Sequence, residues 1–552
     1  MILIIPRIYM LLIFFLFLST NLFSGNDFSV YIIEANINAR STYHLQSNSI
    51  CRQIEQDQNN HNNINACWMV SLAEPPSYID RNIRYFYSSN GGSAFEYIRE
   101  VTATRSGFPV LDVLSDGRVI IGCHSNDFTG SNTTIHLYSN NNPGSSVFTA
   151  ITAGSVNGLY PIWPQITLLP NSKIFFTGGG QTGFVYRNHC SSLTPPGIFS
   201  GYSQEPDIHN LNLTALASSE GKTGLLYIGN DMQFGKILLK ESIDGGITFG
   251  NSQFIWNYNN DSLGGFRGID LIYDGNIPNV VFEVGKIYGP GIHDPFVSSK
   301  IYFWSPAINN GLPKLIDSAG GLTGHGFNSE MLSVCRPVIG LSNPAGLKYI
   351  AYLKARSDTN SEGNNYFDVN IAYSSDGGQN WSIPQQITNT SGDIADYKYV
   401  SISGKNKIIN NTAEVHLLFQ YDSIPQINVP ALNSYKSRMM YAKLSMPVIG
   451  VEPISSIQPE KFILKQNYPN PFNPVTQIEF SVPVNSFVKL KVYNSAGELV
   501  SILAEGEMAR GSYKADFNAA NLASGVYYYV MEYNEENSGR WNSISKKMVL
   551  IK

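Results

Sequence analysis

Charged residues are scarce in this chain. Asp, Glu, Lys and Arg together make up 14% of its 552 residues, against a usual share of about 25%. The formal net charge is only -5, and no basic patch is interleaved with aromatic residues, which argues against nucleic acid as a partner. The length suits two or three domains, and a hydrophobic share of 43% is enough for large buried cores.

Cysteine is also rare, with five residues in total. No Cys-x-x-Cys pair occurs, so a zinc or redox site of that kind is not expected. Cys51 and Cys67 flank the Asn-rich stretch 58–65, which is typical of a hairpin turn. The two would then lie on neighbouring strands, where a disulfide is one option. The alternative is that all five are small buried residues.

Long apolar runs are confined to the N-terminus. Arg7 precedes an almost unbroken apolar run over residues 8–18, and small and polar residues follow over 19–25. The run is short for a membrane span, so residues 1–25 are predicted to be a secretory signal peptide, with an uncleaved anchor as the alternative. We expect no transmembrane segment after signal removal, because no later stretch is long and apolar enough.

Familiar catalytic motifs are missing. The chain has no Gly-x-Ser-x-Gly, no His-Glu-x-x-His and no phosphate-binding loop, and its histidines are scattered. Residues 358–368 have polar spacing that would allow calcium, but they lack the ligand density of a calcium loop. We therefore expect no cofactor and no metal, and the sequence leans away from an enzyme.

Tyrosine (32), phenylalanine (29) and glycine (48) are abundant, which favours many short strands joined by turns. One unusual pattern, Ser-x-Asp-Gly-Gly-x-x-aromatic, occurs twice, and a third copy has Asn in place of Asp. The copies are Ser242-Ile-Asp244-Gly-Gly246-Ile-Thr-Phe249, Ser374-Ser-Asp376-Gly-Gly378-Gln-Asn-Trp381 and Ser88-Ser-Asn90-Gly-Gly92-Ser-Ala-Phe95.

The pattern fits a β-hairpin turn. The Asp or Asn side chain accepts hydrogen bonds from backbone N–H groups of its own turn, and the glycines accept φ > 0. The aromatic residue is expected to start the returning strand and pack inward. The repeat resembles the Asp-box (BNR repeat) of sialidase-like β-propellers, which implies that architecture but little about activity, because these residues are structural.

The repeat extends through the middle of the chain. Strands in the place of the one before this turn are predicted to begin near Arg84, Thr134, Gly183, Gly235, Lys300, Asp368 and Arg438. Each follows an apolar hairpin, which gives four strands per unit. We predict an all-β fold with a seven-bladed β-propeller over residues 26–445. Six blades, a β-helix or a pair of sandwiches are the alternatives. The last unit has three strands, and residues 28–37 are expected to add the fourth.

The sequence pattern changes near residue 446. Residues 446–460 contain Pro447, Pro453 and Pro459 and are predicted to be a linker. Residues 461–552 contain short alternating strands, as in Val488-Lys-Leu-Lys-Val492, which predicts a small immunoglobulin-like β-sandwich.

This C-terminal segment resembles the type A sorting domain of type IX secretion substrates in Bacteroidetes. The matching elements are Asn467-Tyr-Pro469-Asn470-Pro471-Phe472-Asn473-Pro474, Val492-Tyr-Asn494 with Gly497, Gly511 with Tyr513, Ser524-Gly525-Val-Tyr527 and Lys546-Lys547-Met-Val-Leu. The resemblance implies export by the signal peptide, recognition by the type IX secretion machinery, and a secreted or outer-membrane surface protein. An ordinary accessory sandwich is the alternative.

Functional residues of a propeller are expected at one mouth of its channel, on the loops that enter the innermost strands. These loops carry Arg105, Trp163, His209, Arg267, Arg336 and Asp396, and the next loops add His124, Asp127, Glu283, His293 and Asp294. Arginine and aromatic residues around a shallow basin suit a carbohydrate or an anionic ligand. For each arginine, a solvated surface position or an inter-blade ion pair is the alternative.

The leading hypothesis is a monomeric exported protein that binds glycans or other extracellular polymers. The second is a sialidase-like glycoside hydrolase or a polysaccharide lyase, and the third is a structural role in adhesion. The segments Arg105-Ser-Gly-Phe-Pro109 and Arg336-Pro337 faintly resemble the Arg-Ile-Pro element of sialidases. No Tyr/Glu pair or acid can be matched, so no catalytic residue is assigned.

Overall fold

The computed structural model of the chain describes residues 28–36, 52–71, 79–126, 132–179, 183–195, 197–205, 208, 214–229, 235–258, 263–289, 292–323, 331–342, 346–361, 363–388, 395–409, 412–423, 437–447, 451–455, 459–484, 486–508, 510–519, 522–535 and 541–552. The predicted signal peptide lies outside these residues, as do Cys51, Asp127 and His209. Within them the chain forms strands and the short 3-10 turns η1 (Pro170–Ser172) and η3 (Asn309–Gly311), with no α-helix. The all-β prediction is confirmed.

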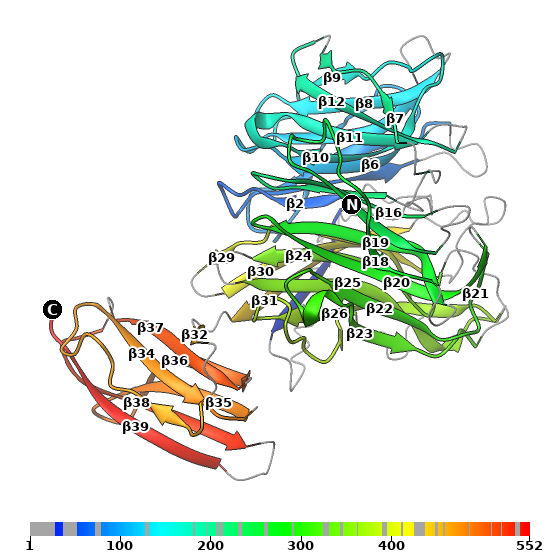
Figure 1. The fold of residues 1–552 in the computed structure, drawn as a ribbon. Helices are drawn as coiled ribbons and strands as arrows, with labels where there is room; N and C mark the ends of the chain where they lie inside the picture. Colours follow the sequence, from blue (N-terminus) through cyan, green and yellow to red (C-terminus); the bar gives the residue numbers. More distant parts are fainter. Residues whose placement is uncertain are drawn as a thin grey trace, which may run out of the picture.

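The described residues between Ser29 and Pro447 form seven antiparallel sheets (Figure 1). Sheet 1 contains β2 (Ile54–Gln56), β3 (Ile64–Val70), β4 (Asn82–Ser88) and β5 (Glu96–Glu100). Sheet 2 contains β6 (Ser106–Val113), β7 (Val119–Asn126), β8 (Thr133–Asn140) and β9 (Phe148–Thr152). Sheet 3 contains β10 (Ile162–Leu168), β11 (Ile174–Gly179), β12 (Val185–Ser192) and β13 (Ile198–Phe199), with β14 (Ser203–Gln204) also on β12.

Sheet 4 contains β15 (Thr214–Ser218), β16 (Thr223–Ile228), β17 (Ile237–Ser242) and β18 (Gln253–Trp256). Sheet 5 contains β19 (Leu263–Asp274), β20 (Ile277–Gly289), β22 (Ser299–Trp304) and β23 (Lys314–Ala319), with β21 (Ile292–Asp294) on β20. Sheet 6 contains β24 (Val334–Ser342), β25 (Leu347–Thr359), β26 (Asn365–Ser374) and β27 (Gln385–Gln386). Sheet 7 contains β28 (Asp396–Ile402), β30 (Thr412–Asp422), β31 (Arg438–Pro447) and β1 (Ser29–Glu34), with β29 (Ile408–Ile409) on β30.

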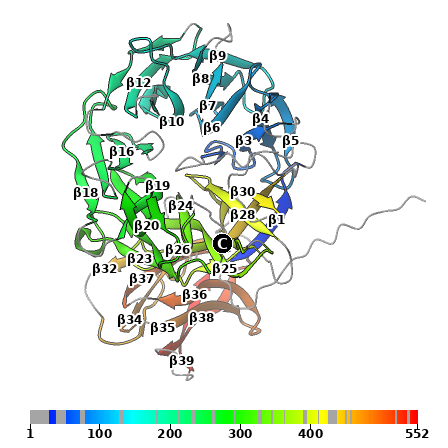
Figure 2. The same ribbon diagram turned by 90° about the vertical axis from the view of Figure 1, so that its right-hand side faces the viewer.

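The seven sheets follow one another around a ring, which Figure 2 shows face-on. The first strands β2, β6, β10, β15, β19, β24 and β28 lie side by side in chain order, and β28 lies beside β2 again. The third strands β4, β8, β12, β17, β22, β26 and β31 begin within three residues of the predicted positions. The N-terminal strand β1 pairs with β31 from Ser29–Ser445 to Glu34–Met440, so its predicted place in the last sheet is confirmed.

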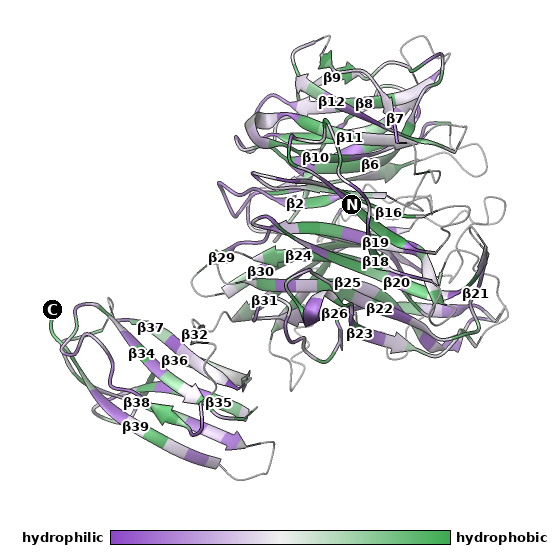
Figure 3. Ribbon diagram, viewed as in Figure 1, coloured by the Kyte–Doolittle hydropathy of each residue, from purple (hydrophilic) through white to green (hydrophobic). Residues whose placement is uncertain are grey.

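The inner strands of these sheets are buried on both faces. Every residue of β3 and of β11 is buried, rather than every second one, because each sheet packs between two neighbours. Hydrophobic colouring accordingly dominates strands such as β6 in Figure 3. Successive hydrophobic clusters join each sheet to the next, and the core therefore runs between the sheets around the ring.

The turn after β17 has the hydrogen bonds that its sequence predicts. The Ser242 hydroxyl donates to Asp244 Oδ1 at 2.7 Å and accepts the Gly246 N–H at 2.7 Å. The Thr248 hydroxyl and N–H also donate to Asp244, which lowers the pKa of that carboxyl to about 2. The same arrangement recurs at Ser374, Asp376 and Gly378, and at Ser88, Asn90 and Gly92. Both glycines of each turn have φ > 0.

Each of these turns packs on an aromatic ring of the preceding sheet. The pairs, with centroid separations, are Phe249 with Phe175 (5.8 Å), Trp381 with Phe303 (5.0 Å) and Phe95 with Tyr441 (4.9 Å). A Cβ on the second glycine of the turn would meet that same ring in all three cases. The aromatic residues pack inward as predicted, although Phe95, Phe249 and Trp381 all precede their fourth strands rather than start them.

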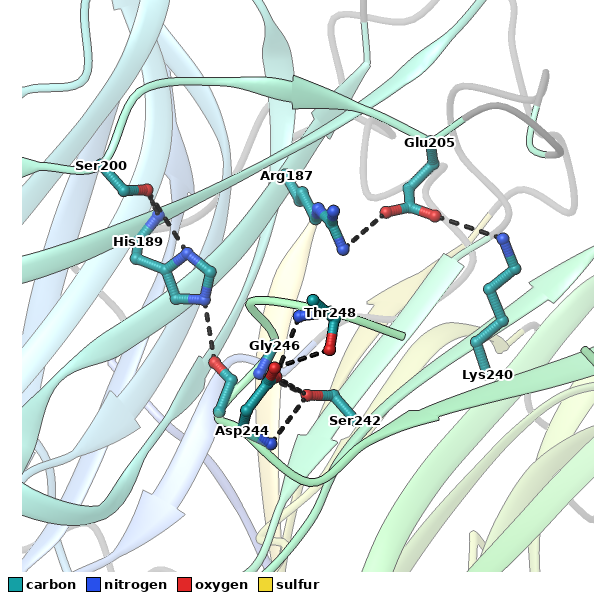
Figure 4. A network of polar contacts seen from close by, with 10 residues as sticks. Arg187, His189, Ser200, Glu205, Lys240, Ser242, Asp244, Gly246 and Thr248 are labelled. Carbon is teal, nitrogen blue, oxygen red and sulfur yellow. Dashed lines mark hydrogen bonds and ion pairs between the residues drawn. The ribbon is translucent and has the colours of Figure 1, made fainter. Parts of the chain in front are cut away.

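Polar contacts reinforce the junction between sheets 3 and 4 (Figure 4). His189 of β12 and the Gly245 carbonyl oxygen of the turn are 2.8 Å apart. Glu205 is only 3% exposed and lies between Arg187 of β12, at 3.1 Å, and Lys240 of β17, at 3.3 Å. Opposite charges therefore stay paired where the two sheets exclude water.

The option of a disulfide at Cys67 is not realised. Cys67 is a buried free thiol, as are Cys123, Cys190 and Cys335. The register of β2 against β3 places Gln53 beside Cys67, and the Cys67 N–H donates to the Gln53 carbonyl at 3.0 Å. The neighbouring strand therefore presents a residue other than Cys51, and the alternative of small buried cysteines applies to these four.

The C-terminal part forms two more sheets around one separate core. The first contains β32 (Val451–Ser455), β37 (Gly511–Asn518), β34 (Val475–Val482) and β33 (Ile463–Leu464). The second contains β36 (Leu499–Met508), β35 (Ser486–Asn494), β38 (Gly525–Glu535) and β39 (Trp541–Leu550). In β35, Val488, Leu490 and Val492 are buried as the alternation predicts.

The predicted linker 446–460 contains a strand of this part of the molecule. β32 pairs with β37, with Pro453 opposite Tyr513. Prolines suggested an irregular linker, but β32 lies at the edge of its sheet, where a residue without an N–H is tolerated.

Candidate functional site

The predicted site residues lie at the N-terminal ends of the first strands. Arg105 directly precedes β6, Trp163 lies in β10, and Asp396 opens β28. Arg267 and Arg336 lie in the first halves of β19 and β24. Because the first strands lie side by side, these positions gather at one end of the ring. We call this end the mouth.

Irregular backbone marks the mouth. Among the described residues, the register between first and second strands shifts within β6, β10, β19, β24 and β28, which indicates a β-bulge in each. Four of these bulges hold a non-glycine residue in the left-handed region: Phe108 (φ 56°), Trp163 (φ 54°), Arg336 (φ 55°) and Tyr399 (φ 52°). Such backbone costs on the order of 1–3 kcal/mol per residue and tends to cluster at functional sites.

Two of these four residues, Phe108 and Tyr399, were not singled out by the sequence. A signal for three of the bulges was present, because Phe108, Trp163 and Arg336 are each followed by proline. A bulge leaves a backbone N–H without a ladder partner, and proline has none to leave. The dipeptide alone is too common to have identified them.

Side chains from the second strand of the preceding sheet hold these bulges. The Phe108 N–H donates to Met69 Sδ of β3 at 3.3 Å, and the Trp163 N–H donates to His124 Nδ1 of β7 at 3.4 Å. The Arg336 N–H donates to Glu283 Oε2 of β20 at 2.5 Å. The same position in three sheets thus supplies an acceptor to the next first strand. We call these three side chains the bulge acceptors.

Glu283 joins two first strands at once. Its second carboxylate oxygen accepts the Arg267 N–H at 3.0 Å, and the side chain is fully buried. The neighbouring Gly268 leaves room for it, since a Cβ there would lie 2.5 Å from Glu283 Oε2. Glu283 was predicted as a residue of the mouth, and the structure places its carboxylate beneath the bulges of β19 and β24.

One half of the mouth is an aromatic cluster. Phe108 lies 5.0 Å from His124 and 6.3 Å from Trp163 between ring centroids, and the Arg81 guanidinium lies 5.8 Å from the Phe108 ring. Burial, together with Arg81 and Arg105, lowers the pKa of His124 to about 3. The imidazole is therefore neutral at physiological pH, as an acceptor of the Trp163 N–H must be.

Sheet 5 forms a second group at the mouth. The Phe266 and His293 rings are 4.1 Å apart, and the Arg267 guanidinium lies 5.4 Å from the Phe266 ring. Burial lowers the pKa of His293, so this imidazole also favours its neutral form. Asp294, next along β21, accepts a hydrogen bond from the Tyr288 hydroxyl at 3.1 Å.

Asp396 is held inside the fold rather than at an open surface. Its side chain is 1% exposed, its Oδ1 accepts the Phe367 N–H at 2.8 Å, and its Oδ2 lies 3.0 Å from Lys398 Nζ. Burial raises the pKa of Asp396 to about 6, against the opposing effect of Lys398. The structure therefore does not bring this carboxylate together with the partly exposed aromatic side chains.

Charged side chains link the first strands across the ring, both midway along these strands and at the ends opposite the mouth. Arg52, just before β2, donates to Asp270 of β19 at 2.7 Å, and Asp270 also accepts the Ile339 N–H of β24 at 2.9 Å. Nearby, Glu55 accepts the N–H groups of Gly404 and Lys405. Burial and the neighbouring Asp112 raise the pKa of Glu55 to about 7. Arg52 thus ties strands of three different sheets across the ring.

No metal centre emerges from the described residues, which contain no group of three or more metal-ligating side chains. In the segment considered for calcium, Asp358 pairs with Arg356 at 2.5 Å and Asp368 accepts the Thr388 hydroxyl at 3.0 Å. Both carboxylates therefore contact side chains of the protein itself.

The predicted sorting motif is built into the C-terminal core. Asn467 is 2% exposed, donates its N–H to the Tyr529 hydroxyl oxygen at 2.9 Å, and donates from its side chain to the Pro469 carbonyl. Asn470 accepts the Val549 N–H of β39, and the Phe472 ring is buried. Pro471, Asn473 and Pro474 complete this segment, and Gly525 and Lys547 lie on β38 and β39. The motif therefore fastens the start of the segment to its last strand.

Comparison with known proteins identifies this C-terminal part. Residues 466–550 match the family described as "Secretion system C-terminal sorting domain". No curated protein sequence matches the chain. Within the described residues, no helix is long and apolar enough to cross a membrane.

Solved structures give distant likenesses to the rest. An ulvan lyase of polysaccharide lyase family PL25 is 9% identical with a TM-score of 0.44, covering 73% of this chain and 94% of that one. The Trypanosoma rangeli sialidase is 10% identical with a TM-score of 0.37, covering 94% of this chain and 89% of that one. The matched family is more definite: residues 466–550 are a type IX secretion system C-terminal sorting domain, and the protein is therefore exported to the cell exterior or surface.

Proposed function

We propose that residues 28–447 are a seven-bladed β-propeller with Asp-box turns, and that its mouth binds an extracellular glycan. Seven sheets of up-and-down strands arranged around a ring support seven blades rather than six. The type IX secretion machinery delivers this propeller, and the C-terminal sandwich, immunoglobulin-like in its two-sheet build, is the module that it recognises.

The left-handed bulges carry the proposal. Regular first strands would close a ring without strain, yet Phe108, Trp163, Arg336 and Tyr399 all adopt φ > 0 at the same end. Strain that recurs at one mouth, with an acceptor placed for three of the four, is best explained by a surface shaped for a ligand.

The side chains suit a sugar polymer. Partly exposed Phe108 and Trp163 offer ring faces on which the C–H faces of pyranose rings can stack. Arg267 is partly exposed and places its guanidinium group beside the Phe266 ring, where it can bind carboxylate or sulfate substituents in two-pronged fashion. An acidic glycan would use both kinds of contact.

A polysaccharide lyase is the second candidate, and the Arg267 guanidinium at the mouth, which can pair with a uronate carboxylate, is the observation that favours it. His124 does not supply the base, because its Nδ1 already accepts the Trp163 N–H and the proton of the neutral ring therefore lies on Nε2. A hydrolase with two carboxyl groups fits less well, because Glu283 and Asp396 are already bound to backbone N–H groups of the fold.

Binding to a glycan array and to insoluble polysaccharides tests the leading proposal. Trp163→Ala should weaken binding by about tenfold or more, because a stacked aromatic ring is an energetic anchor. Phe254→Ala, on the exposed outer strand β18, is the matched control and should bind like the parent protein. Folded protein that retains no polysaccharide at all would refute glycan binding.

The lyase alternative needs a different assay. Incubation with mixed acidic polysaccharides should produce chains with a new unsaturated end if the protein is a lyase, and Arg267→Ala should lower the yield of that product. Binding without any change in the polymer would mean that the protein binds the glycan and does not cleave it.

Delivery is tested by removing residues 460–552. The truncated protein should no longer appear outside the producing cell, because the sorting domain is missing. Continued appearance in the medium or on the surface would contradict the role given to this module.

A further inference from the structure

The outward face of the second C-terminal sheet carries a half-exposed tryptophan. Trp541, the first residue of β39, is 49% exposed. It stands opposite Asn534 of β38, which in turn stands opposite Phe487 of β35. The Phe487 and Trp541 rings meet edge to face with centroids 5.9 Å apart. The indole is therefore held in place although half of it remains open to solvent.

A shallow hollow lies beside this ring. It is lined by Lys489, Glu532, Trp541, Asn542 and Ser543. Lys489, Glu532 and Ser543 occupy directly opposed positions on β35, β38 and β39, so they share the outward face. We call these five residues the sheet-face hollow.

The polar groups of the hollow are held as firmly as the ring. Lys491 pairs with Glu532 at 2.9 Å and fixes that carboxylate on the strand. Lys489 Nζ lies 5.3 Å from the Trp541 ring and 5.6 Å from the Phe487 ring, which keeps the ammonium beside the indole. All of these residues stand on paired strands, so little ordering is needed when a ligand binds.

We propose that the sheet-face hollow is a second carbohydrate-binding site, separate from the mouth, which takes a single sugar ring of a neutral or mildly acidic glycan. The half-exposed indole supplies the flat apolar surface on which a pyranose stacks. An ammonium donor, a carboxylate acceptor and a hydroxyl that does both lie around it. Sugar hydroxyls both donate and accept, and this mixture of neighbouring donor and acceptor groups matches them.

A peptide fits the hollow less well. Peptides bind sheets by adding a strand to an edge, where backbone N–H and C=O groups are unpaired. The hollow lies on the face of the sheet, and the backbone of β38 beneath it pairs with both β35 and β39. Recognition there depends on side chains alone, which favours a stacked sugar ring.

The test uses the chain from residue 26 onward, produced in a host without this secretion route, so that the C-terminal module stays attached. Trp163→Ala is present in every sample, which removes the proposed contact at the mouth. Binding is measured on an array of neutral and acidic oligosaccharides. Trp541→Ala should lower the apparent affinity by about tenfold or more, and Lys489→Ala by less, because stacking on the indole is the main contact.

Tyr528→Ala is the matched control. Tyr528 is 43% exposed on β38 of the same sheet but does not line the hollow, so its loss should leave binding unchanged. A protein that binds no oligosaccharide, or Trp541→Ala binding as well as Tyr528→Ala, would overturn the proposal. Loss of export by Trp541→Ala, without any glycan bound by the parent, would instead assign the hollow to the secretion machinery.

Discussion

The third-strand turns and the first-strand bulges both use left-handed backbone, but with different residues. In the turns, pairs such as Gly377 and Gly378 take φ values of 76° and 102°, and glycine adopts these without steric cost. In the bulges, Phe108, Trp163 and Arg336 take φ values near 55°, although their side chains disfavour them.

The difference separates two sources of conformation. A turn such as the one at Ser242 is specified locally, since the groups that accept its N–H groups lie within four residues. A bulge such as the one at Arg336 is imposed from another sheet, because its acceptor, Glu283, is distant in the chain. The third-strand turns thus follow from local sequence, and the bulges at the mouth follow from packing between sheets.

Loss of Glu283 should have the largest effect on stability, because this side chain holds two of the bulges. Glu283→Ala leaves the buried N–H groups of Arg267 and Arg336 without an acceptor, so the free energy of unfolding should fall by about 3–5 kcal/mol. Urea denaturation of the parent and variant measures this difference.

Glu100→Ala is the control for removing a carboxylate. Glu100 pairs with Arg84 at 2.9 Å but is 46% exposed, so its removal should cost less than about 1 kcal/mol. Equal losses in the two variants would mean that the bulges do not depend on the buried carboxylate.

The contrast also explains what the sequence could predict. The spacing of Ser-x-Asp-Gly-Gly turns and apolar hairpins located the third strands, because both signals are local. The positions of Trp163 and Arg336 at the mouth were predicted from the same spacing of strands. The left-handed backbone of Phe108 and Tyr399 did not, because it depends on side chains from another sheet, such as Met69 for Phe108. The pairing of β32 with β37 was likewise not predicted, because the prolines of residues 446–460 suggested irregular backbone.

The opposite end of the ring should respond to pH. Burial raises the pKa of Glu55 from 4.5 to about 7, so the folded protein holds this proton more tightly than the unfolded chain. The stabilisation is complete below pH 4.5 and is lost as pH rises through 7, which corresponds to at most about 3 kcal/mol. The free energy of unfolding should therefore fall between pH 5 and pH 8.

Glu55→Gln isolates this contribution from other buried carboxyls, such as Asp396, whose pKa is raised in the same direction. The variant cannot titrate at this position, so its unfolding free energy should change less between pH 5 and pH 8 than that of the parent. Identical pH dependence in both proteins would show that Glu55 titrates normally.

A paired substitution sharpens the description of the turns. Gly377→Ala meets no atom within 4 Å and should cost only the left-handed backbone penalty, about 1 kcal/mol. Gly378→Ala would also place its Cβ 2.8 Å from the Phe303 ring, so the loss should be larger by about 1–2 kcal/mol. Thermal or urea unfolding compares the two, and equal losses would argue against close packing of the turn on sheet 5.

The smallest expected effect tests the bulge backbone itself. In an ordinary strand, glycine is less stable than alanine by roughly 0.5–1 kcal/mol, and Ile166→Gly against Ile166→Ala, in the same strand β10, should show that order. At Trp163, with φ at 54°, the order should reverse by about 1 kcal/mol, because alanine retains the left-handed penalty and glycine does not. Both pairs can be measured by urea denaturation. If Trp163→Ala is the more stable variant, as at Ile166, then residue 163 does not need left-handed backbone, and the strain attributed to the mouth is absent there.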